Sequence, residues 1–324
     1  MVKAIRIHKA GGPEALTWEE VALDKPGAGQ ILVRHGAVGL NYIDVYHRTG
    51  LYPLTYPSVI GMEGAGTVEA VGPGVTSLKP GDRVAYASAP VGAYAEARLI
   101  AAERVVRVPD AITDQQAAAM MLQGMTVEYL VRRTYPVKRG DTVVIHAAAG
   151  GIGLIFCQWA KHLGATVIGT VGSDEKAKLA KAHGCDHTIV YTREDFAKQV
   201  REITGGAGVP VVYDSIGKDT FEGSLDCLRP RGLMVSFGNA SGPVASFSPA
   251  ILGAKGSLYL TRPSLVAYTA TRADLEESAK ALFDVVTSGA VKIAVNQTYP
   301  LKDAAQAHRD LEARKTTGST VFIP

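Results

Sequence analysis

The sequence predicts a two-domain α/β protein, in which a doubly wound parallel sheet accompanies a separate β-rich domain. Residues 138–264 alternate β-branched runs with helical segments, a pattern that is typical of a parallel sheet covered by helices. Residues 1–110 instead hold short β segments separated by turns such as Pro26-Gly27 and Gly72-Pro73-Gly74. Such closely spaced strands indicate a small barrel or sandwich. A chain of 324 residues is long enough to bury both cores.

Each element follows from its local pattern. The strands of the parallel sheet are expected at residues 142–147, 166–171, 187–191, 209–216, 232–238 and 256–261, with helices between them such as 174–183. Thr113 and Gln116 form a capping box for a helix, and we expect Gly124 to break this helix from the next one. A long helix from Arg272 ends at Gly289, and we expect the tail that follows to return to the first domain, because its strands resemble those of that region.

Composition and charge exclude several classes of protein. The net charge is only +3 and no basic run occurs, so we expect no dedicated nucleic-acid site and no membrane surface as partner. The longest apolar stretch, 142–160, is interrupted by a glycine turn, so we interpret it as a strand and a buried helix. Three scattered cysteines without a C-x-x-C motif predict neither disulfides nor structural zinc. Without an apolar N-terminal segment, the expected compartment is the cytoplasm.

The stretch from Asp141 to Lys161 carries the clearest functional signal. A β-branched run meets the small-residue turn Ala147 to Gly153, and an apolar helical segment follows. This turn is an A-x-x-G-x-x-G form of the Rossmann fingerprint, placed between a strand and a helix as that fingerprint requires. A helix N-terminus offers unpaired N–H groups and the positive end of a dipole to a pyrophosphate. The sequence therefore predicts a dinucleotide site.

The residues about 20 positions beyond the turn favour NADPH. NAD enzymes carry an acid at the end of the second strand to hold the ribose hydroxyls. This chain has Gly172-Ser173 there, and Lys176 follows in the first turn of the next helix. A hydroxyl, a helix N-terminus and a lysine suit a 2′-phosphate. Asp174 is interpreted mainly as an acid that complements the helix dipole, but it leaves NADH as an alternative.

A second motif resembles the zinc alcohol dehydrogenases but lacks their metal ligands. Gly61 to Gly66, followed by Val71-Gly72 and Gly81-Asp82-Arg83-Val84, is similar to a G-H-E signature in which the histidine binds zinc. Met62 stands in place of that histidine, and Asn41 stands where the family has a cysteine ligand. A thioether is a poor zinc ligand. The resemblance implies the medium-chain dehydrogenase/reductase superfamily without zinc.

Further stretches resemble the NADPH:quinone reductase branch that includes zeta-crystallin, and together they cover essentially the whole chain. They are Asn41 to Asp44, Gly50 to Pro53, His146 to Gly153, Gln158 to Lys161, Val212 to Ser215, Arg231 to Asn239, and Thr261 to Ser264. The resemblance implies a GroES-like catalytic domain, 1–125 completed by 265–324, around a Rossmann domain, 126–264.

The resemblance also implies roles for individual residues. It places Ala149, Gly150, Gly151, Ile152 and Gly153 along the pyrophosphate, and Ser173, Lys176, Tyr191 and Arg314 around the 2′-phosphate. Phe237, Gly238 and Asn239 would pass beside the cofactor; Asn41, Thr126 and the 261–264 loop with Arg262 would border the nicotinamide. Tyr46 and Tyr52 would line a quinone pocket, although tyrosines in a proline-containing loop also serve as packing.

The implied function is zinc-independent quinone reduction by NADPH, with catalysis by proximity and orientation rather than by a nucleophile. Reduction of an α,β-unsaturated carbonyl, as in alkenal or enoyl reductases, is the nearest alternative. A non-catalytic, crystallin-like NADPH-binding protein is another. The segment 256–263 ends the parallel series, and an edge strand of this kind predicts a homodimer through pairing with a second copy.

Overall fold

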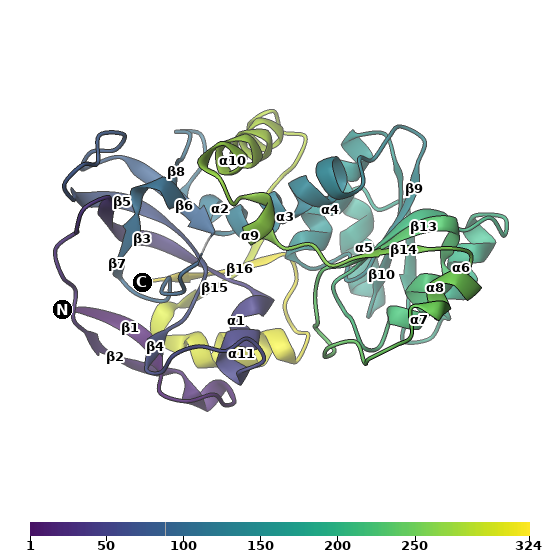
Figure 1. Ribbon diagram of the computed structural model, residues 1–324, viewed down its shortest axis with the longest axis horizontal. Helices are drawn as coiled ribbons and strands as arrows, with labels where there is room; N and C mark the ends of the chain where they lie inside the picture. Colours follow the sequence, from purple (N-terminus) through teal and green to yellow (C-terminus); the bar gives the residue numbers. More distant parts are fainter. Residues whose placement is uncertain (88) are drawn as a thin grey trace. The chain divides into compact units, whose positions relative to one another are not determined.

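The computed structural model describes residues 1–87 and 89–324, which form two compact units (Figure 1). The first unit contains Met1–Met125, Thr269–Thr287 and Ile293–Pro324; the second contains Thr126–Tyr268 and Ser288–Lys292. None of the helices formed by the described residues is long and apolar enough to cross a membrane.

The second unit is built on a six-stranded sheet with the order β11-β10-β9-β12-β13-β14, and every neighbouring pair is parallel. Its strands are β9 (Thr142–Ile145), β10 (Thr166–Val171), β11 (His187–Val190), β12 (Val209–Asp214), β13 (Leu228–Ser236) and β14 (Tyr259–Thr261). Its helices are α4 (Gly151–His162), α5 (Asp174–Ala182), α6 (Phe196–Ile203), α7 (Phe221–Asp226), α8 (Ala250–Ala254) and α9 (Leu265–Tyr268), after a π-helical turn at Leu130–Thr134.

The six predicted strands and their parallel arrangement are thus confirmed. The reason is burial on both faces: β12 is buried at all six positions, so its sequence is an unbroken apolar run ended by Asp214. The order of the sheet turns back at β9, which lies between β10 and β12. In such sheets ligands bind at the carboxyl ends of the strands beside this point, which is where the Ala147–Gly153 turn begins.

The first unit contains two sheets that are mostly antiparallel. A three-stranded sheet has the order β2-β1-β4, and a larger one has the order β15-β16-β3-β5-β6-β8, with β7 also paired to β3. The strands are β1 (Val2–Ile7), β2 (Thr17–Val21), β3 (Gln30–Leu40), β4 (Ser58–Val59), β5 (Glu63–Val71), β6 (Arg83–Ala87), β7 (Ala97–Ala101), β8 (Val106–Arg107), β15 (Val295–Pro300) and β16 (Ser319–Ile323). The helices are α1 (Tyr42–Thr49), α2 (Asp114–Ala118), α3 (Met121–Tyr129, which runs into the second unit), α10 (Arg272–Thr287) and α11 (Ala304–Glu312), with 3-10 turns at Pro13–Ala15, Ala102–Arg104 and Leu301–Asp303.

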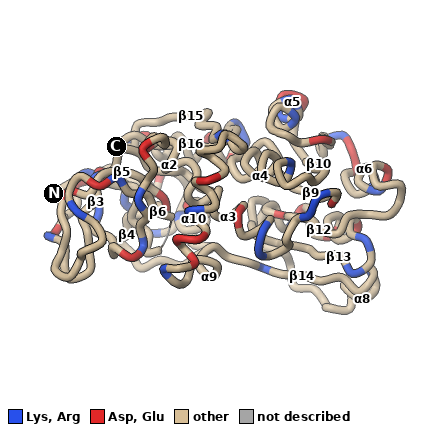
Figure 2. The backbone as a smooth tube through the Cα atoms, turned by 90° about the horizontal axis from the view of Figure 1, so that it is seen from above, with Lys and Arg blue, Asp and Glu red and all other residues tan. Residues whose placement is uncertain are grey.

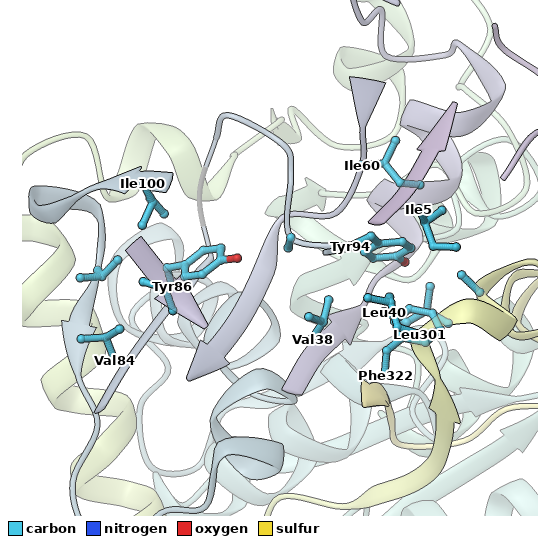
Figure 3. Packing of buried hydrophobic residues seen from close by; sticks show 14 of the residues in the cluster. Ile5, Val38, Leu40, Ile60, Val84, Tyr86, Tyr94, Ile100, Leu301 and Phe322 are labelled. Atoms are coloured by element: carbon cyan, nitrogen blue, oxygen red, sulfur yellow. The ribbon is translucent and has the colours of Figure 1, made fainter. Parts of the chain in front are cut away.

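The C-terminal strand completes the larger sheet, because β16 pairs antiparallel with β3 through Val321 and Gly39. The core beside it is centred on Tyr94, which is fully buried near Ile5 and Ile60 (Figure 3). The Tyr94 ring meets the Phe322 ring edge-on, with 4.9 Å between the centroids. The tail of the chain therefore contributes to the same core as the N-terminal strands.

A buried polar chain also ties this tail to α1. Arg48 is only 1% exposed, and its guanidinium donates to both carboxylate oxygens of Glu312 at 2.8 Å and to His308 Nδ1 at 3.1 Å. Because Nδ1 accepts, Nε2 carries the hydrogen and donates to Tyr94 Oη at 3.1 Å, while Tyr94 donates to Asp44 at 3.0 Å. Burial and the Arg48 charge lower the pKa of His308 to about 3. This neutral link joins a buried cation to a buried carboxyl group, and it fixes α1 against α11.

The prediction that Gly124 breaks a helix is wrong. The chain leaves helical geometry earlier, after α2, and α3 continues through Gly124 to Tyr129. A Cβ atom at Gly124 would lie 2.4 Å from Leu282 Cδ1. The glycine therefore serves close packing of α3 against α10 rather than a break, and packing outweighs its low helix propensity. The predicted capping box at Thr113 and Gln116 is confirmed.

We expect Arg48→Met to lower the free energy of unfolding by about 2 kcal/mol, because it removes the cation of a largely buried ion pair. The value lies below the range for fully buried pairs because the Glu312 side chain is 33% exposed. Urea denaturation measures the change. The control, Arg34→Met, removes a 51%-exposed partner of Glu69 and should cost about 0.5 kcal/mol. Equal costs for the two variants would contradict the structural role of Arg48.

Candidate functional site

The turn from Ala147 to Gly153 connects β9 to α4 and leaves no room for larger residues. Ala147 adopts φ +54°, and Gly150 N–H donates to the Ala147 carbonyl at 2.9 Å. A Cβ atom at Gly153 would lie 2.3 Å from that same carbonyl oxygen. Ala148 N–H donates to the Thr170 carbonyl at 3.0 Å, which joins the turn to β10. The first turn of α4 is therefore held directly against the end of the strand.

The N-terminus of α4 has the chemistry of an anion site. Gly150 is the N-cap residue without a side chain to occupy the helix end, and no acidic residue lies in the first turn of α4. The first N–H groups of a helix have no partner within it, and the helix dipole adds positive potential there. Ala149 is buried, whereas Gly151 and Ile152 are partly exposed, so ligand atoms can reach this backbone. The geometry suits a pyrophosphate group.

Beneath the turn lies a buried network of His146, Asp214 and Ser224. Asp214 accepts from Ser224 Oγ at 2.8 Å, so the Ser224 hydrogen is used and His146 Nε2 donates to Ser224 at 2.9 Å. His146 Nδ1 then accepts from Thr170 Oγ1 at 2.8 Å. Burial lowers the pKa of His146, so the ring stays neutral. With the serine pointing at the aspartate, this is a support for β9, β10 and β12 rather than a nucleophilic triad.

The end of β10 holds the residues predicted for the 2′-phosphate. Ser173 is the N-cap of α5, as predicted, and its Oγ accepts from Lys176 N–H at 3.3 Å. Gly172 lies close to the 40%-exposed Tyr191, because a Cβ atom there would be 3.2 Å from Tyr191 Oη. Asp174 makes two hydrogen bonds with Arg193, at 2.6 and 2.9 Å. Ser173, Lys176 and Tyr191 thus lie at one end of the sheet.

The end of β13 brings together four further predicted residues. Arg262 Nη1 donates to the carbonyls of Ser236 and Gly238, at 2.9 and 3.0 Å. The Asn239 side-chain oxygen accepts from Arg262 Nη2 at 3.0 Å. A Cβ atom at Gly238 would lie 2.4 Å from the Ser215 carbonyl oxygen, so the chain passes close to β12 here. Phe237 N–H donates to the Asp214 carbonyl at 2.8 Å. Arg262 therefore fixes the loop that follows the strand.

In the first unit, the side chain of Asn41 is held from both sides. Its Nδ2 donates to Glu63 Oε2 at 2.6 Å, and its Oδ1 accepts from Gln123 Nε2 at 3.1 Å. Glu63 also accepts from Leu122 N–H at 2.8 Å, and Ser319 Oγ donates to Gln123 Oε1 at 2.7 Å. All four side chains that form this chain, on Asn41, Glu63, Gln123 and Ser319, are buried.

Glu63 sets the direction of this hydrogen-bonded chain. An ionised carboxylate only accepts, so when Glu63 is ionised Asn41 turns its NH2 group toward Glu63 and its oxygen toward Gln123. Burial raises the pKa of Glu63 to about 8, against the hydrogen bonds from Asn41 and the backbone that lower it. Gly39 makes room for the group, because a Cβ atom there would lie 2.3 Å from Glu63 Oε2. The protonation state of one buried acid thus decides which way the Asn41 amide faces.

The predicted pocket tyrosines lie together on α1 and the turn after it. The rings of Tyr46 and Tyr52 meet edge-on, with 5.2 Å between their centroids. The Tyr42 ring is tilted against the Tyr46 ring, with 5.5 Å between those centroids. Tyr52 N–H donates to the Tyr46 carbonyl at 3.0 Å. Tyr46 is buried and Tyr52 is partly exposed. Because Asn41 is the N-cap of this helix, one helix positions all three predicted residues.

The remaining predicted residues belong to different units. Thr126 is buried in α3 in the second unit, whereas Arg314 lies after α11 in the first unit, exposed and at φ +58°. A position of Arg314 beside Ser173 stays a prediction. The sequence interpretation missed Gln123 and Ser319, and it treated Glu63 only as part of a motif. An acid directly before the small residues Gly64, Ala65 and Gly66 at the start of a strand was the available signal.

Met62 and Asn41 occupy the positions of the zinc ligands in the resembling family. Met62 is buried, and its neighbour Glu63 is bonded to Asn41. Among the residues that the structure describes, no group of three or more His, Cys, Asp or Glu side chains is arranged to hold a metal ion.

Comparison with protein families gives two matches. Residues 27–110 match the alcohol dehydrogenase GroES-like domain, and residues 151–286 match the zinc-binding dehydrogenase domain. Among curated proteins, the chain is 53% identical over 325 residues to a quinone oxidoreductase of Pseudomonas aeruginosa, with 100% of both chains covered. It is 50% identical over 333 residues to a 2-haloacrylate reductase of a Burkholderia species, covering 100% of this chain and 99% of the relative.

Among solved structures, the chain resembles Escherichia coli quinone oxidoreductase complexed with NADPH. The TM-score is 0.98 at 51% identity, and the match covers 99% of this chain and 100% of the other.

We expect Glu63→Gln to flatten the dependence of thermal stability on pH. An unfolded glutamate loses its proton near pH 4.5, whereas folded Glu63 keeps it to about pH 8. Stability from this group is therefore fully present below pH 4.5 and is lost as the pH rises through 8. Between pH 5 and pH 9 the Tm of the wild type should fall more than that of Glu63→Gln. Glu69→Gln, at the exposed end of the same strand, is the control; a wild-type profile for Glu63→Gln would contradict the assignment.

Proposed function

The chain belongs to the quinone oxidoreductase family of the medium-chain dehydrogenases and reductases, and we propose that it reduces a quinone with NADPH without zinc. The observation that carries this function is full-length identity of about half to quinone oxidoreductases, combined with the cofactor turn at Gly150–Gly153. Fold alone would not carry it, because the superfamily hosts many reactions.

The residues of the second unit fit NADPH. Because Gly153 has no side chain, the first turn of α4 can pack against the Ala147 carbonyl. The N–H groups at this helix end would hold the pyrophosphate, along Ala149, Gly150, Gly151, Ile152 and Gly153. Ser173, Lys176 and Tyr191 lie together at the end of β10, where they would hold the 2′-phosphate, with Arg314 as a further cation. Phe237, Gly238 and Asn239 would lie along the cofactor, and Arg262 would keep them in place.

When bound, NADPH supplies the hydride. The protein then has to orient the quinone and stabilise the oxygen on which negative charge develops. The hydroxyl groups of Tyr46 and Tyr52 can donate to that oxygen, and their rings can stack on a flat substrate. Asn41 holds its amide in one orientation through Glu63 and Gln123, so it offers a fixed polar group without reorganisation. Thr126 and the 261–264 loop would border the nicotinamide.

These assignments give the two units different roles. We propose that residues 1–125, completed by the C-terminal region, form the catalytic domain and that the parallel-sheet unit binds the cofactor. All three cysteines are free and buried, which is consistent with a reducing compartment, and we propose the cytoplasm.

The purified chain should oxidise NADPH with 1,4-benzoquinone or phenanthrenequinone, measured by the loss of absorbance at the nicotinamide band. Tyr52→Phe removes one donor to the quinone oxygen and should lower kcat/KM about tenfold, as expected for one hydrogen bond at a developing charge. Tyr299→Phe, a tyrosine that donates to Asp310 at 3.0 Å elsewhere in the first unit, is the matched control. No turnover with any quinone would refute the proposed function.

Two further substrates separate the alternatives. An enone and a 2-haloacrylate test reduction of an activated double bond, the reaction class that the name of the Burkholderia relative indicates. Faster turnover of either one than of quinones would assign the chain to double-bond reduction. Binding of NADPH without turnover of any acceptor would indicate a non-catalytic, crystallin-like protein.

We also propose that two copies pair through β14, which is the edge strand of the six-stranded sheet as predicted. Tyr259 on this strand is 62% exposed, and Val266 on α9 is 57% exposed. An exposed apolar edge of this kind is a template for pairing with an identical strand.

Light scattering after size exclusion should give twice the 34.1 kDa mass of the chain. Tyr259→Glu should yield monomers, because a twofold contact brings the two introduced charges together. Lys198→Glu, an exposed position on α6, should leave the dimer intact. A wild-type chain at the monomer mass would exclude the dimer.

A further inference from the structure

We propose that Arg193 is a specificity-determining residue that allows the N-terminus of α5 to accept the 2′-phosphate of NADPH, by neutralising Asp174. This inference rests on the proposed function, because it concerns the choice of cofactor at the same site. The Arg193–Asp174 ion pair lies beside Ser173 at the start of α5, and no sequence motif includes it.

The first turn of α5 presents a conflict of charge. It begins with two acids, Asp174 and Glu175, directly after Ser173. Acids favour the positive end of a helix dipole, but they also repel a phosphate at the same place. Lys176 is a single cation in that turn. A 2′-phosphate carries up to two negative charges, so the site needs further positive charge close to Asp174.

Arg193 supplies this charge with a fixed geometry. Its Nη1 donates to Asp174 Oδ2 at 2.9 Å, and its Nη2 donates to Asp174 Oδ1 at 2.6 Å. The pair links the turn after β11 to the start of α5, and Arg193 N–H is itself held by the Val190 carbonyl at 3.1 Å. The guanidinium lowers the pKa of Asp174, so the carboxylate stays ionised and paired. Figure 2 shows acidic and basic residues together on α5.

The pair also disfavours the alternative in which Asp174 binds the ribose of NADH. An acid that selects NAD accepts a hydrogen bond from the ribose 2′-hydroxyl. Each oxygen of Asp174 accepts one hydrogen bond from Arg193, which turns the carboxylate toward the guanidinium and uses half of its accepting capacity. Gly172, at the usual position of that acid, has no side chain and lies against Tyr191. Without Arg193, the Asp174 carboxylate would be able to turn toward the ribose, and it would repel a phosphate there.

Equilibrium binding tests this role without turnover. Dissociation constants for NADPH, NADH, 2′-AMP and 5′-AMP are measured by calorimetry for the wild type, Arg193→Gln, Asp174→Asn and the double variant. Arg193→Gln should weaken NADPH and 2′-AMP about fivefold, the size expected when one exposed charge is left uncompensated, and should leave NADH and 5′-AMP unchanged or tighter. The double variant should return NADPH to within about twofold of wild type, because both charges are gone.

Arg193 and Asp174 are both more than half exposed, so an exposed lysine provides the matched control. Lys198→Gln makes the same change of net charge on α6 and should not alter any of the four affinities. Unchanged NADPH affinity in Arg193→Gln would overturn the proposal. A double variant as weak as Arg193→Gln would also overturn it, because Arg193 would then contact the phosphate itself. A wild type that binds neither nucleotide would refute the proposed function instead.

Discussion

Gly153 packs against the Ala147 carbonyl with no room for a Cβ atom, and the geometry of the turn depends on this contact. Because no Cβ fits there, the first turn of α4 can lie directly on the end of β9 and direct its N–H groups past the sheet. Ala147 contributes a positive φ, which costs energy for a residue other than glycine. The neutral His146 network beneath the turn offsets this cost by joining three strands. A turn strained in this way remains in place only where its surroundings are rigid.

The first unit uses buried acids for a similar purpose. Asp44 and Glu63 are both fully buried, and burial raises their pKa values to about 7 and 8. A buried acid is costly, so each accepts hydrogen bonds from buried donors, and those donors acquire fixed directions. Asp44 directs Tyr94 and the Asn41 backbone, while Glu63 directs the Asn41 side chain. The position that binds zinc in resembling enzymes thus holds an amide that is oriented by a carboxyl group on the neighbouring strand.

The sequence predicted most of the strands and helices, but it did not predict the contacts between residues that are remote in the chain. The strands of the parallel sheet could be predicted because each is an apolar run that ends in a turn, and the N-cap at Ser173 because its signal is local. Gly124 was misjudged because its packing partner, Leu282, is remote in sequence. For the same reason the hydrogen-bonded chain around Asn41, whose other members come from β5, α3 and β16, could not be predicted. Patterns of spacing report neighbours along the chain, whereas these networks join residues that only the fold brings together.

The Asp174–Arg193 ion pair and the buried Asn41 network differ in how much free energy each can contribute. The Asp174–Arg193 pair is more than half exposed, so water and salt screen it, and it can adjust affinity by only a small factor. In the proposed site, Ser173, Lys176 and the helix end would therefore provide most of the discrimination for a 2′-phosphate, and the ion pair would remove an obstacle rather than create the site. The Asn41 network is shielded from water, where a misdirected hydrogen bond is costly. Cofactor preference in this chain should consequently be easier to alter by surface substitutions than the orientation of the Asn41 amide.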